Sequence, residues 1–390
     1  MFRIQPLGSC EDFCPKDEIR LRTKEHLLDF YELNEGQKNS PGTVVKAFSR
    51  SAAGVKTPKQ QDLRTIGALK RTVEYLLIKI VPDKRKPFNF VYDFVFDRLR
   101  SVRQEIVIQN LDNSVIVELL EPIILFLAYS SYRLSGEPIS TFDPKICNQH
   151  LQECLKRVLC CYDELSQETQ SLKGLEKRNF IEALYQIFNL GSTEALVRWS
   201  SLPKKIRTGA FDLAGRMSLE FYRGNYYRVI AGVRKLPHLL YAVAYLKLPE
   251  IRRRMLLTFS HAYNSKQLSV PLDWLEELLF YTTWEDLIND CKYFNICVLL
   301  DKDAVRFSKQ EFKHEETAPP CKPHRAVEIK FNFLNLPKLL VKAINDFHVG
   351  DSDFSNKQEF HFFVHGHPLA DPEDVPDDIL SRVAQPPEFR

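Results

Sequence analysis

The chain has 390 residues, of which 44% are hydrophobic and 27% are charged, and this composition is typical of a globular protein rather than a disordered one. Its length allows more than one domain. The formal net charge is only +3, from 54 basic and 51 acidic residues, so the global charge does not indicate a polyanionic partner.

The sequence contains no apolar window of the ~18 to 20 uncharged residues that would span a bilayer. The most apolar window, residues 115–132, is interrupted by Glu118, Glu121 and Pro122. The N-terminus turns acidic early and lacks the apolar core of a secretory signal. We therefore expect a soluble protein that is not secreted and has no membrane partner.

The nine cysteines form no C-x-x-C pair, so neither a disulfide framework nor a zinc site is indicated. Cys147, Cys154 and Cys161 recur every seven residues, which places them on one face of a helix. Cysteine is among the most buried residue types, so we predict a buried stripe rather than a reactive site. No metal and no cofactor is predicted.

Amphipathic helices dominate the sequence up to about residue 290. The segment from Thr57 is predicted to begin with Thr57 as N-cap, Pro58 at the first helical position and Gln60 at the third. Asp143 and Pro144 begin another helix in the same way. Further amphipathic segments cover residues 15–31, 88–110, 114–134, 176–189, 204–222, 225–234 and 237–264.

Short polar, Gly or Pro connections join each helix to the next, with almost no strand-like alternation. This pattern predicts an all-α, irregular helical-repeat solenoid of the TPR/PCI-like kind rather than a bundle around one centre. No strict sequence period is present, so the repeat is one of shape only.

The pattern changes after Pro271. Two helices are predicted there, the second with a capping box of Thr282 and Glu285, followed by short strands at 296–300 and 304–308. Two helices followed by a β-hairpin predict a winged helix, an architecture associated with PCI-type assembly scaffolds.

These changes predict five regions. They are an N-terminal segment at 1–14, the helical repeat at 15–268, the winged helix at 269–312, a linker rich in Pro and charge at 313–326, and a small α+β C-terminal extension with an acidic tail at 327–390. Within the extension, 326–333 and 359–367 form the β-rich part and 336–347 is a helix.

Motifs that carry catalytic chemistry are missing from the sequence. It has no phosphate-binding loop, no G-x-G-x-x-G turn, no H-E-x-x-H helix and no G-x-S-x-G elbow. His361, His365 and His367 are the best metal candidate, although their spacing matches no strong template and favours surface or packing roles. Asp93 and Asp97 lie one helical turn apart, but ion pairing, notably of Asp97 with Arg100, is favoured over acid–base catalysis. We predict that the protein is not an enzyme and has no small-molecule substrate.

Positive charge is concentrated between Ser200 and Ser260, where twelve cations face only three anions. Such a segment just before a winged helix is typical of phosphate-backbone binding. Tyr222, Tyr226 and Tyr227 are interleaved with the cations and could stack on single-stranded bases. An acidic protein surface is the alternative partner. The candidate nucleic-acid-binding residues are Lys204, Lys205, Arg207, Arg252, Arg253, Arg254, Lys302, Arg306 and Lys309.

Several stretches together resemble the Sac-three/GANP family. They occur in the family's order and are "CPKDEIRLR" at 14–22, "VVKAFSRSAAG" at 44–54, "QDLR" at 61–64, "YDFVFDRLRSVRQEI" at 92–106 and "ISTFDPKICN" at 139–148. The resemblance covers roughly residues 10 to 310. The residues that match the family signature are Phe48, Arg50, Ser51, Tyr92, Asp93, Phe94, Asp97, Arg98, Arg100, Arg103, Phe142 and Asp143.

The signature residues are interpreted as architectural. Val91, Val95, Leu99, Val102 and Ile106 advance by helical spacing and draw one apolar stripe. The arginines of the same segment are nearly balanced by acidic residues, so we expect them to lock neighbouring helices together rather than to bind nucleic acid.

The resemblance implies a scaffold of a TREX-two-like complex that binds a PCI-domain protein, a small acidic Sem/DSS-type peptide and RNA, in support of nuclear mRNA export. The sequence has no phenylalanine-glycine repeats and is most similar to the short Sac-three-domain-containing proteins. These imply an alternative, an interaction module in centrosome duplication and mitotic spindle assembly. We expect a nuclear location, with cytoplasmic and centrosome or spindle pools.

Overall fold

The computed structural model describes residues 7–34, 41–50, 58–165, 172–321, 323, 327–328, 331 and 335–341. This part of the chain is mostly helical, as predicted. The helical elements are α1 (Lys16–Lys24), η1 (Phe30–Glu32), η2 (Gln60–Asp62), α2 (Ile66–Tyr75), η3 (Leu76–Ile80), α3 (Phe88–Ile108), α4 (Asn113–Arg133), α5 (Pro144–Glu164), α6 (Leu172–Phe188), α7 (Thr193–Ser201), α8 (Gly209–Tyr222), α9 (Tyr226–Arg234), α10 (His238–Tyr245), α11 (Leu248–Ala262), α12 (Leu272–Leu279), α13 (Trp284–Tyr293), η5 (Leu300–Lys302) and α15 (Leu336–Val341).

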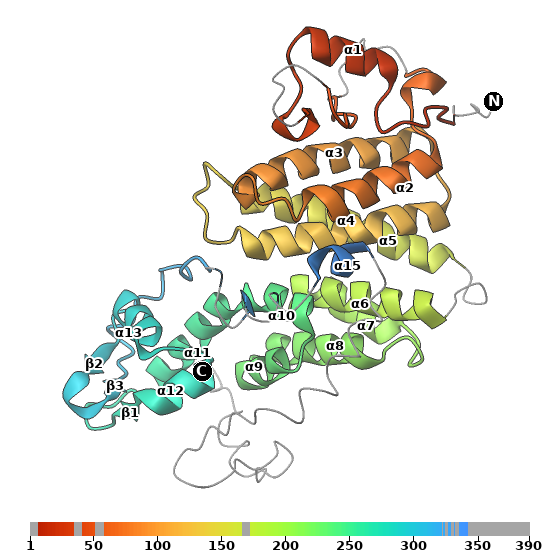
Figure 1. Cartoon of the computed structure of the whole chain (residues 1–390). Helices are drawn as coiled ribbons and strands as arrows, with labels where there is room; N and C mark the ends of the chain where they lie inside the picture. Colours follow the sequence, from red (N-terminus) through yellow and green to blue (C-terminus); the bar gives the residue numbers. More distant parts are fainter. Residues whose placement is uncertain are drawn as a thin grey trace.

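From α1 to α13 the helices stack in chain order from one end of the molecule to the other, and α15 lies out of this order at the level between α4 and α10 (Figure 1). The segment that carries α1 covers α3, and α2 to α5 form the upper part of the stack. Below them lie α6 to α11, and a small unit of α12, α13 and three short strands closes the lower end at one side. The order of stacking follows the sequence, as expected for a helical repeat.

The start of α2 differs from the prediction. Thr57 lies outside the described residues, and the helix begins only at Ile66, where the Thr65 hydroxyl accepts a hydrogen bond from the Ala68 amide at 3.2 Å. The chain before it is held extended, because the Thr65 amide donates to the Cys10 carbonyl at 2.9 Å. Gln60 therefore belongs to the short turn η2 and not to the first turn of α2.

Two other helix boundaries were also wrong. The predicted helix over 204–222 begins only at Gly209, and a separate helix, α7, precedes it without having been predicted. The predicted helix over 237–264 divides into α10 and α11, and Pro249 lies in the first turn of α11. Proline has no amide hydrogen, so it fits the first turn of a new helix but would break the interior of a continuous one.

Helix α3 confirms the predicted apolar stripe. Val91, Val95, Leu99, Val102 and Ile106 are all buried. They belong to a continuous core that extends into α2, α4 and α5. The helix is thus fixed by packing along its whole length.

Helix α4 is long and apolar enough to cross a membrane by length and composition, with a mean hydropathy of 1.6. However, 72% of that window is buried inside the protein. The helix packs against α2, α3, α5 and α10, so a core helix explains its composition.

Helix α5 begins as predicted, with the Asp143 carboxylate accepting from the Lys145 amide at 2.8 Å. The predicted cysteine stripe is also confirmed, because Cys147, Cys154 and Cys161 are all buried. Burial raises the pKa of Cys147 to about 12 and that of Cys154 to about 11. These thiols are therefore protonated core side chains.

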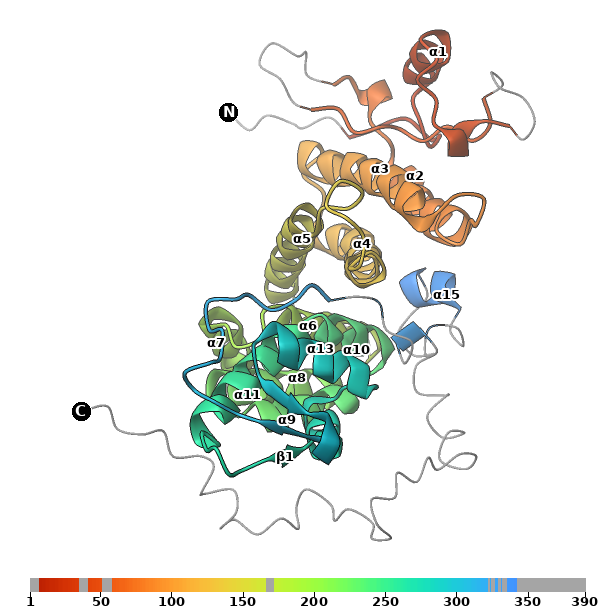
Figure 2. The ribbon, with the colours of Figure 1, turned by 90° about the vertical axis from the view of Figure 1, so that its left-hand side faces the viewer.

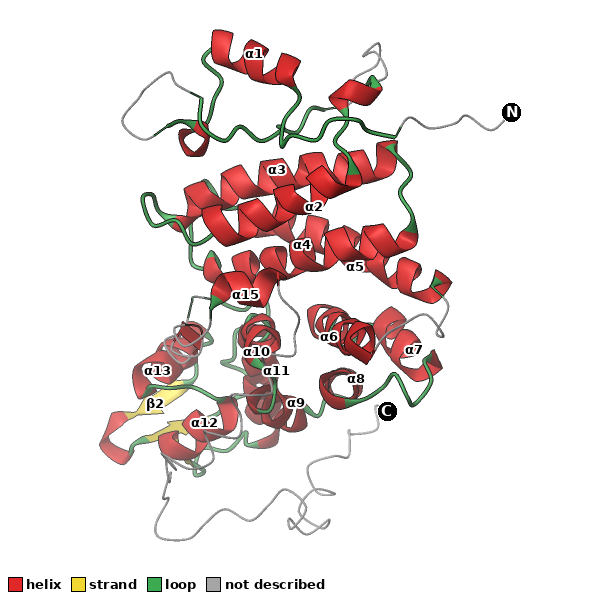
Figure 3. Cartoon of the chain, turned by 45° about the vertical axis from the view of Figure 1, so that its right-hand side comes forward, coloured by secondary structure: helices red, strands yellow, loops and turns green. Residues whose placement is uncertain are grey.

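The unit at the lower end contains the predicted helix pair and hairpin (Figure 3). Strands β2 (Cys297–Leu299) and β3 (Ala304–Arg306) pair antiparallel, and β1 (Val270–Pro271), which was not predicted, pairs with the other edge of β3. The cap of α13 is Thr283 rather than Thr282, since the Thr283 hydroxyl accepts from the Asp286 amide at 3.2 Å. The element order from α11 is helix, strand, two helices and two strands.

The predicted C-terminal extension is described only in part. Val327, Glu328 and Phe331 are helical, so the predicted β-rich start of the extension is wrong at these positions. The predicted helix over 336–347 is present as α15 for its first six residues. The predicted strand at 359–367, the acidic tail, and His361, His365 and His367 lie outside the described residues.

Candidate nucleic-acid interface

Arg252, in α11, is part of the protein's internal packing. It is 8% exposed. Its guanidinium donates through Nε to the Leu279 carbonyl at 3.0 Å and through Nη2 to the Phe280 carbonyl, and it stacks on the Tyr281 ring at 3.8 Å. These carbonyls lie at the C-terminal end of α12, where a helix leaves carbonyls without partners of its own. The prediction that Arg252 contacts nucleic acid is corrected: the residue joins α11 to α12.

Arg253 and Arg254 share a single carboxylate on their own helix. Arg253 Nε lies 2.9 Å from Glu250 Oε2, and Arg254 Nε lies 2.7 Å from Glu250 Oε1. Burial alone would raise the pKa of Glu250, but the two arginines outweigh it and lower that pKa. Arg254 also donates to the Tyr226 hydroxyl at 3.3 Å, which joins α11 to α9. Both guanidiniums are therefore partly neutralised.

Two further arginines of the basic segment lie against aromatic rings. Arg207 lies over the Trp199 ring at 5.3 Å, and Arg234 lies over the Phe280 ring at 4.8 Å. Arg234 also donates to the Glu277 carbonyl at 2.7 Å, which links α9 to α12. The charge concentration seen in the sequence therefore overstates the positive charge that reaches the surface.

Exposed cations remain at the α7–α8 connection and at the hairpin. Lys204 and Lys205 are exposed in the connection, while Lys302 lies in η5 and Lys309 follows β3. Arg306, in β3, is only half-exposed. These four lysines have no ion pair within the part of the chain that the structure describes.

The four lysines do not form one compact patch. The α7–α8 connection and the β2–β3 hairpin lie at opposite ends of the lower part of the molecule, with α9 to α12 between them (Figure 1). A ligand that contacts both would need to be extended. Of the three interleaved tyrosines, Tyr222 is 64% exposed and Tyr227 is 46% exposed, whereas Tyr226 is bonded to Arg254.

The signature residue Arg98 lies where the N-terminal segment packs on α3. Arg98 donates to both oxygens of Glu32, at 3.3 and 3.2 Å, and Arg22 bonds the same carboxylate. The amides of Asp29 and Val45 each donate to Glu32 at 3.0 Å. Burial alone would raise the pKa of Glu32. The charge of Arg98, the hydrogen bond from the Asp29 amide and the charge of Arg22 together outweigh burial, so the pKa is lowered. We call these five residues the Glu32 cluster.

Arg100 and Asp97 hold the next part of the segment on the same helix. The Arg100 guanidinium lies 3.9 Å from the centre of the Phe48 ring, and the Phe48 amide donates to Asp97 Oδ2 at 3.2 Å. Asp97 pairs with Arg98 rather than with Arg100, so that part of the prediction is wrong. Arg50 is exposed, and Ser51 lies outside the described residues.

Arg103 joins α3 to α5. It donates to His150 Nδ1 at 2.7 Å and to Glu153 at 2.9 Å. Burial, and then the charge of Arg103, lower the pKa of His150. The ring is therefore neutral near neutral pH and can accept the hydrogen bond.

Aromatic signature residues complete the joint between α3 and α5. Tyr92 and Phe142 meet edge to face with ring centres 5.1 Å apart, just before the Asp143 cap of α5. Phe94 lies under the Arg98 guanidinium at 4.7 Å. These contacts join α3 to its neighbours, and the architectural role of the signature residues stays a prediction. Asp93 is exposed on α3.

The buried carboxylates at the centre of these contacts were not identified from the sequence. Besides Glu32, Glu105 on α3 is buried and accepts from the Arg64 amide at 2.7 Å and from Arg64 Nε at 3.0 Å. Lys46 lies 3.1 Å from the same carboxylate. A single acidic residue gives no periodic signal in the sequence. Only the apolar residues spaced around Glu105 indicate that its side chain is buried. No group of three metal-binding side chains occurs among the described residues.

Taken together, the fold and these contacts define a helical-repeat protein whose buried polar networks hold its own helices together. Exposed cations lie near its lower end. Residues 13–299 match the model of the SAC3/GANP family. The chain therefore belongs to the SAC3/GANP family.

Individual relatives agree with this assignment. The chain is 27% identical to Protein xmas of Drosophila melanogaster over 308 residues, which is 74% of this chain and 14% of that protein. It is 38% identical over 107 residues to SAC3 family protein 1 of Schizosaccharomyces pombe, covering 27% of this chain and 10% of the relative. SAC3 family protein B of Arabidopsis thaliana is 28% identical over 165 residues, 40% of this chain and 10% of that protein. The chain thus spans a small part of the length of these relatives.

Proposed function

We propose that this chain is a non-enzymatic scaffold of a TREX-two-like complex that acts in nuclear mRNA export. Its partners in this proposal are a PCI-domain protein with a small acidic Sem/DSS-type peptide, and RNA. The observation that carries the proposal is the family match over residues 13–299, which includes the whole helical stack and most of the unit at its lower end.

The lower unit is the proposed contact with the PCI-domain partner. Its element order, from α11 to β3, supports the proposal that this unit is a winged helix. Trp274, Tyr293 and Leu300 are exposed on it, and exposed aromatic and aliphatic side chains are common anchors of protein interfaces. These side chains support a protein contact at this end of the molecule.

The proposed RNA contact uses the exposed lysines and tyrosines rather than the arginines of α11. Lys204, Lys205, Lys302 and Lys309 are free to approach phosphates, and each contact would release counterions. Tyr222 and Tyr227 are exposed between the two lysine pairs in sequence and could stack on bases.

Co-purification tests the scaffold role. The tagged full chain is recovered after low-salt lysis, and the bound proteins are identified by mass spectrometry. We expect a PCI-domain protein with wild type, at least fivefold less with Trp274→Ala, and unchanged recovery with Phe90→Ala, an exposed aromatic residue on α3. Recovery of no PCI-domain protein by wild type would reject the scaffold role.

Charge reversal tests the RNA contact. Lys204, Lys205, Lys302 and Lys309 are replaced by Glu, with a matched control in which the exposed Lys16, Lys24, Lys59 and Lys145 are replaced by Glu. Binding of a single-stranded RNA is measured against salt, and the slope should fall by about 0.7 for each phosphate that the variant no longer neutralises. Equal slopes for the two variants would exclude these lysines from RNA binding.

A second candidate function is an interaction module in centrosome duplication and spindle assembly. The observation in its favour is that Arg252, Arg253 and Arg254 are already engaged within the chain, which leaves fewer cations for a phosphate backbone. The remaining exposed cations would then contact an acidic protein. Recovery of centrosomal or spindle proteins without RNA, under the same low-salt conditions, would favour this function.

A further inference from the structure

A C-terminal segment returns to the helical stack and contacts α10, α4 and η3. Cys321 Sγ donates to the Tyr245 carbonyl of α10 at 3.7 Å, and Phe331 packs on Tyr129 and Tyr132 of α4 with ring centres 5.4 and 6.0 Å apart. The segment then ends in α15, which packs against η3 and α4. We call the described residues between Cys321 and Val341 the C-terminal latch.

The latch is anchored by buried apolar side chains. Val327, Leu339 and Leu340 are buried, while Lys338 of the same helix is exposed. α15 begins at a side-chain cap, because Asn335 Oδ1 accepts from the Lys338 amide at 3.1 Å. A capped helix with one apolar face is the usual ligand of an apolar groove.

The groove that receives α15 has an unusual backbone. α2 continues into η3, a π-helix in which the Val81 amide donates to the Leu76 carbonyl at 3.0 Å, five residues earlier. Single π turns within helices are rare and are frequently found at functional sites. Here α15 packs against both the π turn and α4, and we call the surface that these two elements present to α15 the η3–α4 groove.

The latch also joins two parts of the stack. It makes its first contact with α10 in the lower part and its last contact with η3 in the upper part. Figure 2 shows α15 beside the stack at the level between α4 and α10. The latch therefore adds a contact between two parts that also meet where α5 packs on α6 and where α4 packs on α10.

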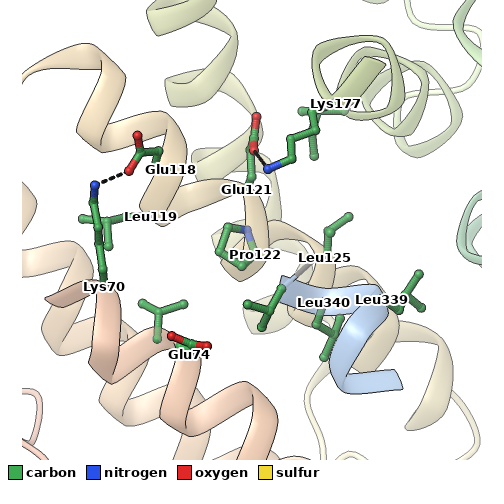
Figure 4. A pocket seen from close by; sticks show the side chains of 13 residues that line it. Lys70, Glu74, Glu118, Leu119, Glu121, Pro122, Leu125, Lys177, Leu339 and Leu340 are labelled. Atoms are coloured by element: carbon green, nitrogen blue, oxygen red, sulfur yellow. Dashed lines mark ion pairs between the residues drawn. The ribbon is translucent and has the colours of Figure 1, made fainter. Parts of the chain in front are cut away.

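An open pocket adjoins the end of the latch. Leu339, Leu340 and Val341 line a cavity of about 210 Å³, together with residues of α2, α4 and α6 (Figure 4). On its rim Lys70 pairs with Glu118, and Lys177 lies 3.8 Å from Glu121. The end of the latch therefore borders solvent, as expected for a segment docked on the outside of the helical stack.

We propose that the C-terminal latch is an intramolecular ligand that occupies the groove between η3 and α4 reversibly. The same groove binds this segment in trans when the attached copy has been released. Local opening of this kind requires few buried contacts, and the latch has few compared with the long helices that it crosses. The proposal goes beyond the scaffold function and does not depend on it.

The test uses the full chain and a labelled synthetic peptide with the sequence of residues 327–347. Leu340→Asp places a charge on the buried face of α15 and releases the attached latch, whereas Lys338→Asp places the same residue on its exposed face. We expect Leu340→Asp to bind the peptide at least tenfold more tightly than wild type or Lys338→Asp does. Amide exchange in η3 and α4 should rise in Leu340→Asp and fall again when peptide is added.

Two controls separate latch release from unfolding. A peptide that itself carries Leu340→Asp should not bind, and Leu339→Ala, a milder change, should give an intermediate peptide affinity. Equal peptide affinity of wild type and Leu340→Asp would overturn the proposal. An increase in exchange throughout the chain without peptide binding would also overturn it, because α15 would then be an ordinary part of the core.

Discussion

The arginines of α3 and those of α11 look alike in the sequence but differ in their contacts. Those of α3 reach across to other elements, where Arg98 meets the Glu32 carboxylate and Arg103 meets α5. On α11, Arg253 and Arg254 bond a carboxylate one turn away on the same helix, and Arg252 reaches backbone carbonyls. The first group joins distant parts of the chain through charge, and the second mainly fixes the start of the lower unit.

This difference shows that a local count of positive charge does not measure a binding surface. The α3 segment looked balanced in sequence and the α11 segment looked basic, yet the guanidiniums of both are engaged within the protein. The distinction that matters is whether a cation has partners inside the fold, since an engaged guanidinium must lose them before it can bind a phosphate.

The largest effect is expected from Glu32→Gln. It removes the fully buried carboxylate that Arg22 and Arg98 share, so Arg98 keeps only Asp97 and Arg22 only the more distant Glu18. Breaking a buried ion pair costs about 3–5 kcal/mol of unfolding free energy. Urea unfolding followed by circular dichroism measures the loss. The control is Asp17→Asn, which removes an exposed pair with Arg20 and should cost under about 1 kcal/mol. Equal losses of unfolding free energy for the two variants would show that the Glu32 cluster stabilises the fold no more than an exposed ion pair does.

A somewhat smaller effect is expected from Arg252→Ala. It removes charge-assisted hydrogen bonds to two carbonyls of the α12 end, for a loss of about 2–3 kcal/mol. Hydrogen exchange should rise first in α12, because the change acts at the junction of α11 and α12. Arg216→Ala, at an exposed pair with Asp212, is the control. Unchanged hydrogen exchange in α12 would contradict the role of Arg252 in joining α11 to α12.

The Glu32 cluster should also make the stability of the protein sensitive to acid. The pKa of Glu32 in the folded chain is below its ordinary value of 4.5, so its stabilising contribution is complete above that pH. The contribution is lost as the pH falls from 4.5 through the folded-state pKa. Unfolding free energy measured across this range should fall less steeply for Glu32→Gln than for wild type. If the unfolding free energies of wild type and Glu32→Gln fell equally steeply with pH, the lowered pKa of Glu32 would be contradicted.

The smallest effects are expected from Arg253→Ala and Arg254→Ala taken singly. Each leaves the other arginine on Glu250, so each should cost about 0.5 kcal/mol, within the range of exposed helical pairs. The double variant should cost more than the sum of the two, because Glu250 then loses both partners. A strictly additive pair would show that the two arginines do not share the carboxylate.

Much of the helical architecture could be predicted from apolar spacing alone. The stripe of α3, the cysteine face of α5 and the Asp143 cap depend on local periodicity and cap chemistry, which a sequence displays directly. The predicted starts of α2 and α13 were wrong because two threonines compete for each cap: Thr57 and Thr65 for α2, and Thr282 and Thr283 for α13. Contact between Thr65 and the N-terminal segment selects the true start of α2, and that contact is tertiary.

The candidate interface was harder to predict because exposure is a property of the fold. Nothing local distinguishes Arg252, which is buried, from Lys204, which is exposed. Glu32 was missed for the same reason, since its partners come from three separate stretches of the chain. The family resemblance, by contrast, depends on residues at fixed positions and was confirmed.

The cysteine stripe of α5 has a practical consequence for labelling. Cys147 and Cys154 are buried thiols with raised pKa values, so they present little thiolate to an alkylating reagent. Cys160 on α5 and Cys297 on β2 are exposed. In a variant whose half-buried Cys10 and Cys321 are replaced by Ser, a limiting amount of maleimide dye should therefore mark one site in the upper part of the stack and one in the lower unit. Energy transfer between these two dyes would report directly on how the two parts move relative to each other.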